Sequence, residues 1–354
     1  MKVLHLPHNI NSRISESVAL QRKIGIDAKG VAINNYLGDV AEHVKVFNPR
    51  DYGFLNPKKY FEYFSAHREL QKLIQWADII HWYYNWKVLR TERVINFVKY
   101  FNKPAVVEFL GSEIRIPEIL FNQNPYYKKI FSLEYSYQFE SLEHSRSVQK
   151  KFKDAGFEAL VRPELEQFIQ KDIFPFYHKI NNRIEVKKYS PTYPSTEKKK
   201  SLVVHPVSSR NAKGTNYVLE AIEKLKQKYD FEFSLIEHLQ HQQALALMSK
   251  ADIVIDQLIL GAFGTISLEG MCFGKPTICF LTDEFQKNMH EIPLVNANPN
   301  TIYSALETLL LNPTMRNEIG IRSREYVEAF HDAEKINFHL KNIYEEIIRK
   351  KRDK

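Results

Sequence analysis

Short apolar runs alternate with amphipathic segments along the second half of the chain, and each run has the length of one buried strand. In the segments between the runs, apolar residues recur three and four positions apart, as expected for helices packed on a sheet. The runs lie at 201–207, 231–237, 252–258 and 275–281, and the helical segments at 216–229, 241–251 and 265–273. Strands separated by helices in this way predict an α/β unit with a parallel, helix-covered sheet.

The first half shows the same alternation with weaker signals. Strand-like runs lie at 2–6, 77–84, 103–111 and 158–168, the last of which includes the loop after its strand. Residues 15–25 form an amphipathic segment that ends at Gly25, a residue type suited to the position just past a helix. Residues 116–154 are mostly helical in pattern and rich in aromatic side chains. The first half is therefore predicted to form a second α/β unit.

The alternation breaks down before residue 201, where prolines, serines and the charged run "EKKK" replace it. A chain of 354 residues with 44% apolar content is long enough for two domains with separate cores. We predict a first domain at 1–175, a linker at 176–200, a second domain at 201–332 and a final helix at 333–354. One apolar stripe runs along that helix, at Ile336, Leu340, Ile343, Tyr344 and Ile347. The stripe must be buried against another surface.

Composition narrows the classes of function. The net charge is +8 with a pI near 9.1, but the basic residues are spread over the chain and form no concentrated stripe. The charge allows peripheral contact with an anionic membrane, whereas nucleic acid is not expected as a partner. No run of 18 apolar residues occurs, and the N-terminus lacks the apolar stretch of a signal peptide. We therefore expect a cytoplasmic protein, with any membrane contact at the inner face.

The two cysteines, Cys272 and Cys279, lack the paired short spacings of a zinc site and have no further ligand types close by in the sequence. They are predicted to be buried, reduced thiols. The sequence predicts no metal site.

The loop "HPVSSRNAKGT" at 205–215 follows the first strand of the second half. Arg210 offers a planar fork of donors and Lys213 a compact ammonium, while Gly214 lets the backbone approach a ligand closely. Thr215 or Asn216 could cap the helix that follows. Two cations and the N–H groups of a helix N-terminus would then face one phosphate-bearing ligand. A basic strand-to-helix connection without a ligand is the alternative.

A second loop, "DQLILGAFGTISLEGMCFGKP" at 256–276, has a similar form. Gly261 and Gly264 flank a tight turn, a helix begins near Thr265, and Glu269 lies one turn into it. Backbone N–H groups would reach a phosphate or sugar hydroxyl, and the carboxylate a diol such as ribose. A turn glycine and a solvated glutamate are the alternatives, but a carboxylate among apolar neighbours is costly without a partner.

Together the two loops resemble the nucleotide-sugar-binding domain of retaining glycosyltransferases with the GT-B fold, family 4-like (glycosyl transferases group 1). The family's His-Pro-Ser-like strand end with Arg and Lys-Gly-Thr is met by "HPVSSRNAKGT". Its Gly-aromatic-Gly loop with Glu-x-Met-x-x-Gly-Lys-Pro is met by "GAFGTISLEGMCFGKP". The likeness is specific over about 201–281 and looser elsewhere. It implies two Rossmann-like domains facing each other across a cleft, with the final helix crossing back to the first.

The resemblance also implies an activity. A hexose-like sugar would move from a nucleotide-diphosphate donor to a glycan, lipid-linked or other small acceptor in the synthesis of cell-surface polysaccharide or glycoconjugate. The anomeric configuration would be retained, and neither a metal nor another cofactor would be needed.

Roles for single residues follow from the same resemblance. Arg210 and Lys213 would hold the donor diphosphate, and Glu269 the ribose hydroxyls. Backbone groups around Gly264, Thr265 and Ile266 would bind the phosphate or the sugar.

The sequence departs from the family pattern at one donor position. Many relatives carry two glutamates with seven residues between them, and counting back from Glu269 gives Gly261. The earlier carboxylate is missing, which leaves open how the donor sugar is held. Asp256, at the end of the preceding strand, could replace it. Glu237, which ends its own strand, would either meet the nucleotide base or lie exposed.

The first half matches the family more loosely, as its acceptor-binding domain would. In "HNINSR", relatives often have glycines that bind phosphate. Here the candidate hydrogen-bond donors to a phosphate are Asn9, Asn11 and Ser12. "DIIHWYYNW" resembles the strand that ends in a histidine near the acceptor, which makes His81 a catalytic candidate, although a structural histidine is the commoner case. "FLGSEIR" resembles the family's Gly-Ser-Asp-x-Arg loop. Ser112 matches the serine of that loop, and Glu113 stands where the family has aspartate.

Other functions remain open at this stage. A nucleotide-sugar epimerase uses the same scaffold without a separate acceptor. A nucleic-acid-binding module is suggested by the pI alone. A dinucleotide oxidoreductase is disfavoured, because "PHNINSR" and not a G-x-G-x-x-G turn follows the first strand. The sequence leaves the nucleotide, sugar, acceptor and oligomeric state undetermined.

Overall fold

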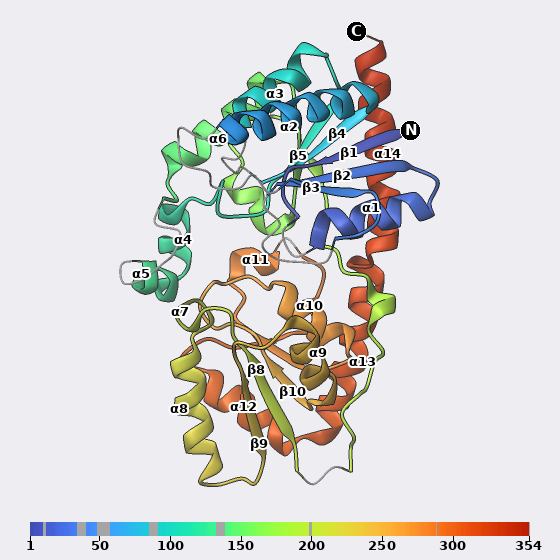
Figure 1. The fold of residues 1–354 in the computed structure, drawn as a ribbon. Coiled ribbons are helices and arrows are strands. Elements are labelled where there is room, and N and C mark those ends of the chain that lie inside the picture. Colours follow the sequence, from blue (N-terminus) through green and yellow to red (C-terminus); the bar gives the residue numbers. More distant parts are fainter. Residues whose placement is uncertain are drawn as a thin grey trace. The chain divides into compact units, whose positions relative to one another are not determined.

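The computed structural model describes residues 1–9, 12–33, 40–47, 57–84, 91–131, 139–197, 200–287 and 289–353. The chain forms two compact units, each built on a parallel sheet (Figure 1). Unit 1 contains residues 1–116, 140–181 and 333–354, and unit 2 contains 117–139 and 182–332. The predicted fold class, a pair of Rossmann-like α/β units, is confirmed. The chain passes from one unit to the other at four points, and the one between residues 181 and 182 lies inside the segment in which the sequence pattern breaks down.

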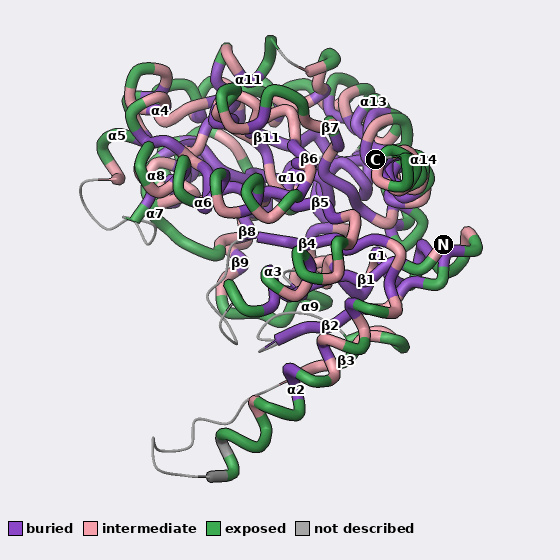
Figure 2. Tube along the Cα trace, turned by 90° about the horizontal axis from the view of Figure 1, so that it is seen from above, coloured by how far each residue is buried: buried purple, intermediate pink, exposed green. Residues whose placement is uncertain are grey.

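In the described residues, unit 1 has a seven-stranded parallel sheet in the order β3-β2-β1-β4-β5-β6-β7. The strands are β1 (Lys2–Leu6), β2 (Asp27–Ile33), β3 (Val44–Phe47), β4 (Ile79–Tyr83), β5 (Ala105–Glu108), β6 (Glu158–Val161) and β7 (His178–Lys179). The helices are α1 (Arg13–Lys23), α2 (Pro57–Trp76), α3 (Thr91–Tyr100), α6 (Leu142–Asp154) and α14 (Ala333–Arg352), with a 3₁₀ helix at Pro163–Phe168. The central strands are buried over nearly their whole length (Figure 2). Burial on both faces explains why they read as continuous apolar runs.

The final helix, α14, packs on unit 1. Its apolar stripe is buried at Ile336, Leu340, Ile343, Tyr344 and Ile347. The stripe joins the core formed by α1 and the first strands, where Val3, Ile14 and Val18 are fully buried. Gly25 lies just past the end of α1 with φ of 79°, as its place in the sequence pattern indicated.

Unit 2 has a five-stranded parallel sheet in its described residues, in the order β12-β11-β10-β8-β9. The strands are β8 (Leu202–Pro206), β9 (Glu232–Ile236), β10 (Ile253–Ile255), β11 (Thr277–Cys279) and β12 (Val295–Asn296). The helices are α4 (Pro117–Gln123), α5 (Pro125–Phe131), α7 (Arg210–Lys213), α8 (Thr215–Lys226), α9 (His241–Lys250), α10 (Thr265–Cys272), α11 (Asp283–Lys287), α12 (Ile302–Leu311) and α13 (Pro313–Phe330), with a 3₁₀ helix at Val186–Lys188.

Successive strand residues of unit 2 face opposite layers. Val203 belongs to the core shared with α8 and α12, whereas Val204 belongs to the core shared with α9, α10 and α13. This alternation is the two-residue period of a strand covered by helices on both faces. Both cysteines are buried, as predicted, and lie in the core shared with α9, α10 and α13. Burial raises the pKa of the Cys279 thiol to about 12 and also raises the pKa of Cys272. Both therefore stay protonated near neutral pH.

Residues 117–139 belong to unit 2, although the sequence pattern placed them in the first domain. Asn124, fully buried, accepts hydrogen bonds from the N–H groups of Tyr126 and Tyr127 and donates to the carbonyl of Ile259. Tyr126 also lies edge-on against Phe280. The contacts with Ile259 and Phe280 join residues more than a hundred positions apart, so helical periodicity could not reveal them.

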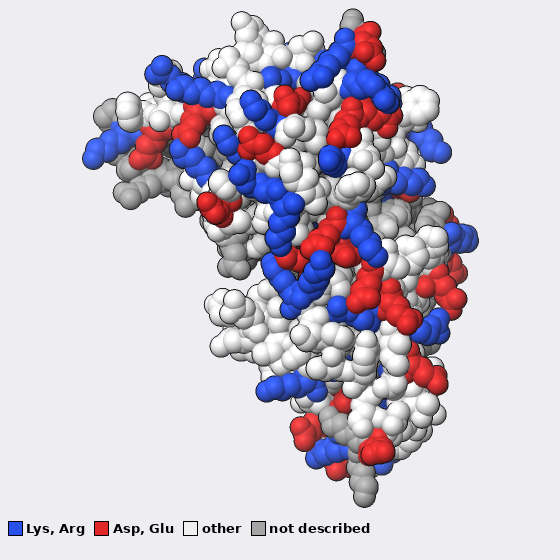
Figure 3. Space-filling view, turned by 90° about the vertical axis from the view of Figure 1, so that its right-hand side faces the viewer, with Lys and Arg blue, Asp and Glu red and all other residues white. Residues whose placement is uncertain are grey.

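Charges of both signs are interspersed on the surface. On the face shown in Figure 3, Lys and Arg side chains alternate with Asp and Glu and form no continuous basic stripe. That face is unlike the concentrated basic surface typical of nucleic-acid-binding proteins. Among the described helices, none combines the length and apolar character needed to cross a bilayer.

Candidate functional site

The predicted donor-site residues gather at one edge of the unit 2 sheet. Parallel strands all end at the same edge, so the loops after β8, β9 and β10 begin next to one another. The loop after β8 carries Arg210 and Lys213, β9 runs directly into Glu237, and β10 into Asp256. The loop after β10 leads to Glu269 on α10.

The first loop contains a helical turn that the sequence pattern did not indicate. Arg210 and Lys213 are the ends of α7, and Gly214, with φ of 71°, separates α7 from α8. A Cβ on Gly214 would lie 3.1 Å from a side-chain atom of Ile259. The glycine therefore allows this turn to pack tightly against the second loop.

Neither Thr215 nor Asn216 caps α8, contrary to the expectation, because the N-cap position is Gly214 and both residues lie inside the helix. Thr215 has another partner. Its hydroxyl lies 3.1 Å from Nε2 of His205, and Nδ1 of that imidazole lies 2.8 Å from the carbonyl oxygen of Ile255. The carbonyl can only accept, so Nδ1 carries the proton and Nε2 accepts from Thr215. Burial lowers the pKa of His205 to about 4, which keeps it neutral.

Arg210 forms an exposed ion pair with Glu237. Its Nε and Nη2 donate to the two carboxylate oxygens at 2.8 and 2.6 Å, while 52% of the arginine side chain is exposed. The hydrogen bond from Arg210 lowers the pKa of Glu237. Pairs this exposed open at little cost, so the guanidinium is available to another anion.

Lys213 forms a more buried pair with Asp256. Its ammonium contacts Oδ1 of the fully buried carboxylate, and the Ser267 hydroxyl donates to Oδ2 at 2.5 Å. Burial by itself raises the pKa of Asp256, but the charge of Lys213 and the hydrogen bonds from Lys213 and Ser267 outweigh it and lower the pKa. The ionised carboxylate thus fixes the ammonium and also holds the first turn of α10.

The N-terminus of α10 lies open at Gly264. In the described structure no side chain caps this helix, and no heavy atom lies within 4 Å of the Cβ position on Gly264. Thr265, the first helical residue, is exposed. The first N–H groups of a helix have no partner within the helix, so an anion can bind them here.

Glu269 is nearly buried and contacts His241. The histidine Nε2 lies 2.6 Å from Oε1 of Glu269, and the Tyr189 hydroxyl lies 3.5 Å from the same oxygen. The Glu269 side chain is 4% exposed, but that of His241 is 67% exposed. The carboxylate therefore has the partner that its apolar setting requires, and most of that partner's side chain faces solvent.

Gly261 has no room for the missing glutamate. It has φ of 78°, and a Cβ there would lie 2.6 Å from Cγ2 of Thr282 and 3.1 Å from Nδ2 of Asn124. Asp256 is fully buried and bound to Lys213 and Ser267, so its oxygens do not face an open space. The side chains of Thr282 and Asn124 thus occupy the space that a side chain at position 261 would need.

The predicted donor residues form separate pairs rather than one cluster. Arg210 pairs with Glu237, Lys213 with Asp256, and Glu269 with His241. Ser267 links the second pair to α10, two residues before Glu269. No described contact joins Arg210, Lys213 and Glu269 directly, although all three pairs lie on loops and helix starts at the same sheet edge.

In unit 1, His81 lies in a buried polar cluster that the sequence indicated only in part. His81 is fully buried, with Nε2 3.2 Å from Oε2 of Glu108 and Nδ1 against the hydroxyl of Tyr344. Its ring stacks on Tyr83 at 4.2 Å, and the Tyr83 hydroxyl lies 3.0 Å from Nδ1 of His5. His5 and Glu108 were not named from the sequence. The signal for them was a polar residue among the buried positions of "KVLHL" and "AVVE".

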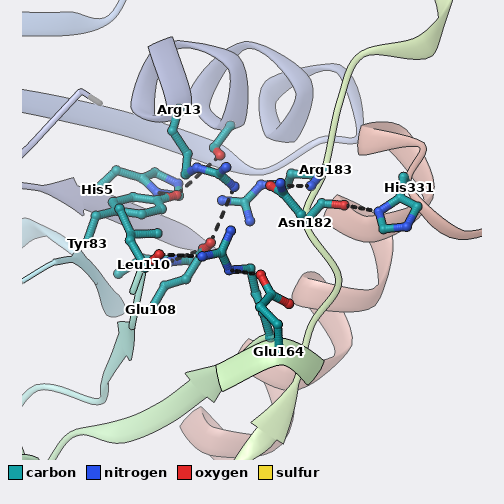
Figure 4. Close-up of polar contacts among 12 residues, drawn as sticks. His5, Arg13, Tyr83, Glu108, Leu110, Glu164, Asn182, Arg183 and His331 are labelled. Carbon is teal, nitrogen blue, oxygen red and sulfur yellow. Dashed lines mark hydrogen bonds and ion pairs between the residues drawn. The ribbon is translucent and has the colours of Figure 1, made fainter. Parts of the chain in front are cut away.

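Arg13, drawn beside Glu108 in Figure 4, and Arg162 lie next to the carboxyl ends of strands in the unit 1 sheet. Arg13, at the start of α1, lies 3.4 Å from the other oxygen of Glu108. Arg162, directly after β6, donates to the carbonyl of Leu110 and lies 3.1 Å from Glu164. Both side chains are 13% exposed and paired with carboxylates.

The remaining acceptor-side candidates mostly fix their own loops. Asn9 exchanges two 3.0 Å hydrogen bonds with Ser15, and the Ser112 hydroxyl lies 2.9 Å from that of Tyr84. The Glu113 carboxylate accepts from the N–H groups of Leu110 and Gly111, and burial raises its pKa to about 7. Ser12 is half-buried with φ of 58°, and Asn11 lies outside the described residues.

Among the described residues, no group of three or more His, Cys, Asp or Glu side chains is arranged to hold a metal ion.

Solved structures with the same fold include several sugar-active enzymes. Sucrose-phosphate synthase from Thermosynechococcus elongatus has a TM-score of 0.63 at 16% identity and covers 98% of this chain and 99% of its own. The catalytic domain of starch synthase IV from Arabidopsis thaliana, bound to ADP and acarbose, has a TM-score of 0.60 at 12% identity with both chains fully covered. A putative UDP-N-acetylglucosamine 2-epimerase from Listeria monocytogenes has a TM-score of 0.53 at 12% identity, covering 97% and 95%.

At such low sequence identity, the structural likeness establishes the fold alone, and the reaction must be argued from the residues. No protein-family model matches the sequence, and no curated protein matches it. The likeness to these solved structures shows that the chain has the two-unit GT-B fold over its whole length.

Proposed function

We propose that the protein is a glycosyltransferase that takes its sugar from a nucleotide-diphosphate donor bound at the carboxyl edge of the unit 2 sheet. The observation that carries the proposal is the placement of two cations, Arg210 and Lys213, at the same sheet edge as the open N-terminus of α10. The sugar-active enzymes with this fold add support at the level of architecture.

The two cations would stabilise the leaving group. When the glycosidic bond to the donor breaks, negative charge grows on the diphosphate, and fixed positive charge lowers the energy of that state. Lys213 is already held in place by Asp256, so little reorganisation is needed. Arg210 would exchange Glu237 for a phosphate. With these charges supplied by side chains, we expect a reaction without a metal ion. Retention of the anomeric configuration is what the family resemblance implies.

The rest of the donor would lie along α10. Backbone N–H groups around Gly264, Thr265 and Ile266 would receive a phosphate or a sugar hydroxyl, because the helix start is uncapped and unobstructed. Glu269 would bind the ribose diol after His241 moves aside. Such a diol offers two donors to one carboxylate.

The acceptor would bind at the carboxyl edge of the unit 1 sheet and would be a glycan, a lipid-linked sugar or another small molecule. His81 remains a catalytic candidate through the family resemblance. Its full burial between Glu108 and Tyr344 favours a positioning role, in which it orients Glu108 and, through it, Arg13.

An epimerase acting on a nucleotide sugar is the second candidate, because an enzyme described as such shares the fold. Thermal-shift screening against UDP-, GDP- and ADP-sugars would first find the donor, since a ligand that binds the folded state raises its stability. The protein would then be incubated with that donor alone and with candidate acceptors. A transferase releases nucleoside diphosphate in an acceptor-dependent way, whereas an epimerase converts the donor without an acceptor. A panel without any thermal shift contradicts both.

A further inference from the structure

The first half of α2 exposes a group of large aromatic side chains. Tyr60, Phe61 and Phe64 are 54%, 73% and 66% exposed, so three rings within two helical turns lie in solvent. Figure 2 shows this end of α2 projecting beyond the buried strands of its unit. Single exposed apolar residues are common on proteins, but a contiguous group marks an interaction surface.

The three rings lie on one side of the helix. With about 100° between successive residues, Tyr60, Phe61 and Phe64 fall within an arc of about 100°. Ala66, Leu70 and Ile74, which face the core of unit 1, lie about a third of a turn away. The aromatic face is therefore distinct from the face that anchors α2 to the unit.

Exposed cations continue the aromatic face. Arg68 and Lys72 follow Phe64 at four-residue steps, so they lie on nearly the same side, one and two turns further along. Lys58 is also exposed, whereas Glu62 lies on the opposite side from the rings, and Glu69 is paired with Lys45. The exposed surface of α2 is thus apolar and aromatic at one end and positively charged at the other.

The size and shape of this surface argue for one kind of partner. Three aromatic side chains bury about 450–750 Å² at most, less than the roughly 800 Å² per partner of a stable protein–protein interface. A projecting helix flank also cannot enclose a small ligand. Aromatic rings combined with Lys and Arg on one helix are the pattern of segments that lie in the interface of an anionic membrane.

We propose that α2 docks the protein on an anionic lipid bilayer, with the rings of Tyr60, Phe61 and Phe64 in the headgroup region and Arg68 and Lys72 against lipid phosphates. The proposal does not depend on the enzymatic activity.

The test is co-sedimentation with vesicles of equal parts phosphatidylglycerol and phosphatidylcholine, and with vesicles of phosphatidylcholine alone. We expect binding to the anionic vesicles that weakens at high salt, because exposed charges are screened. In the double variant Phe61→Ser/Phe64→Ser, binding should fall at least about tenfold, since both rings leave the interface. Circular dichroism should show the fold unchanged, because both positions are exposed.

The matched control is Tyr100→Ser/Phe338→Ser, which removes two rings from the same unit that are 80% and 56% exposed. It should bind the vesicles like the unaltered protein. Equal binding by the Phe61/Phe64 variant, equal loss in the control variant, or no binding of the unaltered protein to anionic vesicles would each overturn the proposal. Self-association that disappears only in the Phe61/Phe64 variant would assign the surface to a second copy of the chain instead.

Discussion

Arg210 and Lys213 are both paired with carboxylates, but the two pairs differ in burial. The Arg210 side chain is half exposed beside Glu237, whereas Lys213 contacts a fully buried Asp256. An exposed pair gains little from its contact, and a buried pair is strongly destabilised if one partner is lost. We therefore expect Arg210 to change partner when an anionic ligand binds and Lys213 to remain where it is.

Replacing Lys213 by alanine should reduce the rate of sugar transfer about ten- to a hundredfold. A hydrogen bond to a charged group contributes about 1.5–3 kcal/mol, and this one would be made to the departing diphosphate. The measurement is the initial rate of nucleoside diphosphate release at saturating donor. Lys224→Ala, which removes an exposed lysine from α8, is the control and should be fully active.

Loss of Lys213 also leaves the charge of Asp256 buried, which should cost about 3–5 kcal/mol of stability. The double variant Lys213→Met/Asp256→Asn removes both charges and should recover much of that stability without recovering the rate. If the double variant regains full activity, the ammonium has no part in the reaction.

Substitution by alanine should affect stability at one loop glycine, Gly261, and leave it unchanged at the other, Gly264. At Gly261 the positive φ and the 2.6 Å approach to Thr282 require distortion, so Gly261→Ala should lower stability by about 1–3 kcal/mol. At Gly264, φ is −125° and the Cβ position is open, so Gly264→Ala should leave the stability unchanged. Its new methyl group would instead lie where a phosphate is proposed to bind.

Urea unfolding and nucleotide titration of both variants check this expectation. Gly264→Ala should bind the donor nucleotide more weakly while unfolding like the unaltered protein. Unchanged nucleotide affinity in Gly264→Ala would mean that no ligand approaches the start of α10.

The buried His205 should make the protein less stable in mild acid. Its pKa is about 4 in the folded protein against 6.5 unfolded, so its contribution is complete above pH 6.5 and is lost as the pH falls toward 4. From about pH 8 to about pH 5 the loss is about 2 kcal/mol. His205→Asn should be less stable than the unaltered protein at the higher pH, with a smaller difference at the lower pH. A difference that is the same at both pH values would show that His205 does not bind a proton on unfolding.

At the scale of elements, the strands that form continuous apolar runs and the final helix were predictable, whereas β2, α13 and several short or distant features were not predicted. The runs at 2–6, 201–207 and 252–258 contain β1, β8 and β10, because burial on both faces leaves a continuous apolar run. The single turn of α7 is too short to show a helical period. The segment with α4 and α5 belongs to unit 2, where the Asn124 side chain bonds to a residue 135 positions away in the chain.

The candidate site was predictable to a similar extent. Its cations, glycines and Glu269 could be named because they lie in continuous motifs. Glu237 and Asp256 were named for other roles, but their pairing with the two cations, and that of His241 with Glu269, could not be predicted, since these residues meet only through the order of strands in the sheet. His81 was named, but the cluster around it includes Tyr344, 263 residues away.

At the scale of the whole molecule, unit 1 is completed by a helix from the far end of the chain. Leu340 and Tyr344 of α14 are fully buried in its core, and Asn337 accepts a hydrogen bond from the buried Gln21. Removing a helix with several buried apolar residues costs far more than a single core substitution, which already costs about 2–5 kcal/mol for Leu to Ala.

A chain truncated after Asp332 should therefore lose the structure of unit 1 and keep that of unit 2. Hydrogen exchange measured by mass spectrometry would show rapid exchange in β1 and β4 and protected amides in β8 and β10. Leu340→Ala should show a weaker form of the same pattern. Protection of β1 and β4 in the truncated chain would mean that α14 is not needed for the core of unit 1.

The position of α14 also affects how the protein is made on the ribosome. All seven described strands of unit 1 have been synthesised once residue 179 is in place, but α14 begins only at Ala333. At about 5–20 residues per second, the nascent sheet waits roughly 8–30 s for the helix that covers it. Unit 2 is complete before α14 appears, so the half of the protein translated first is the half that finishes folding last.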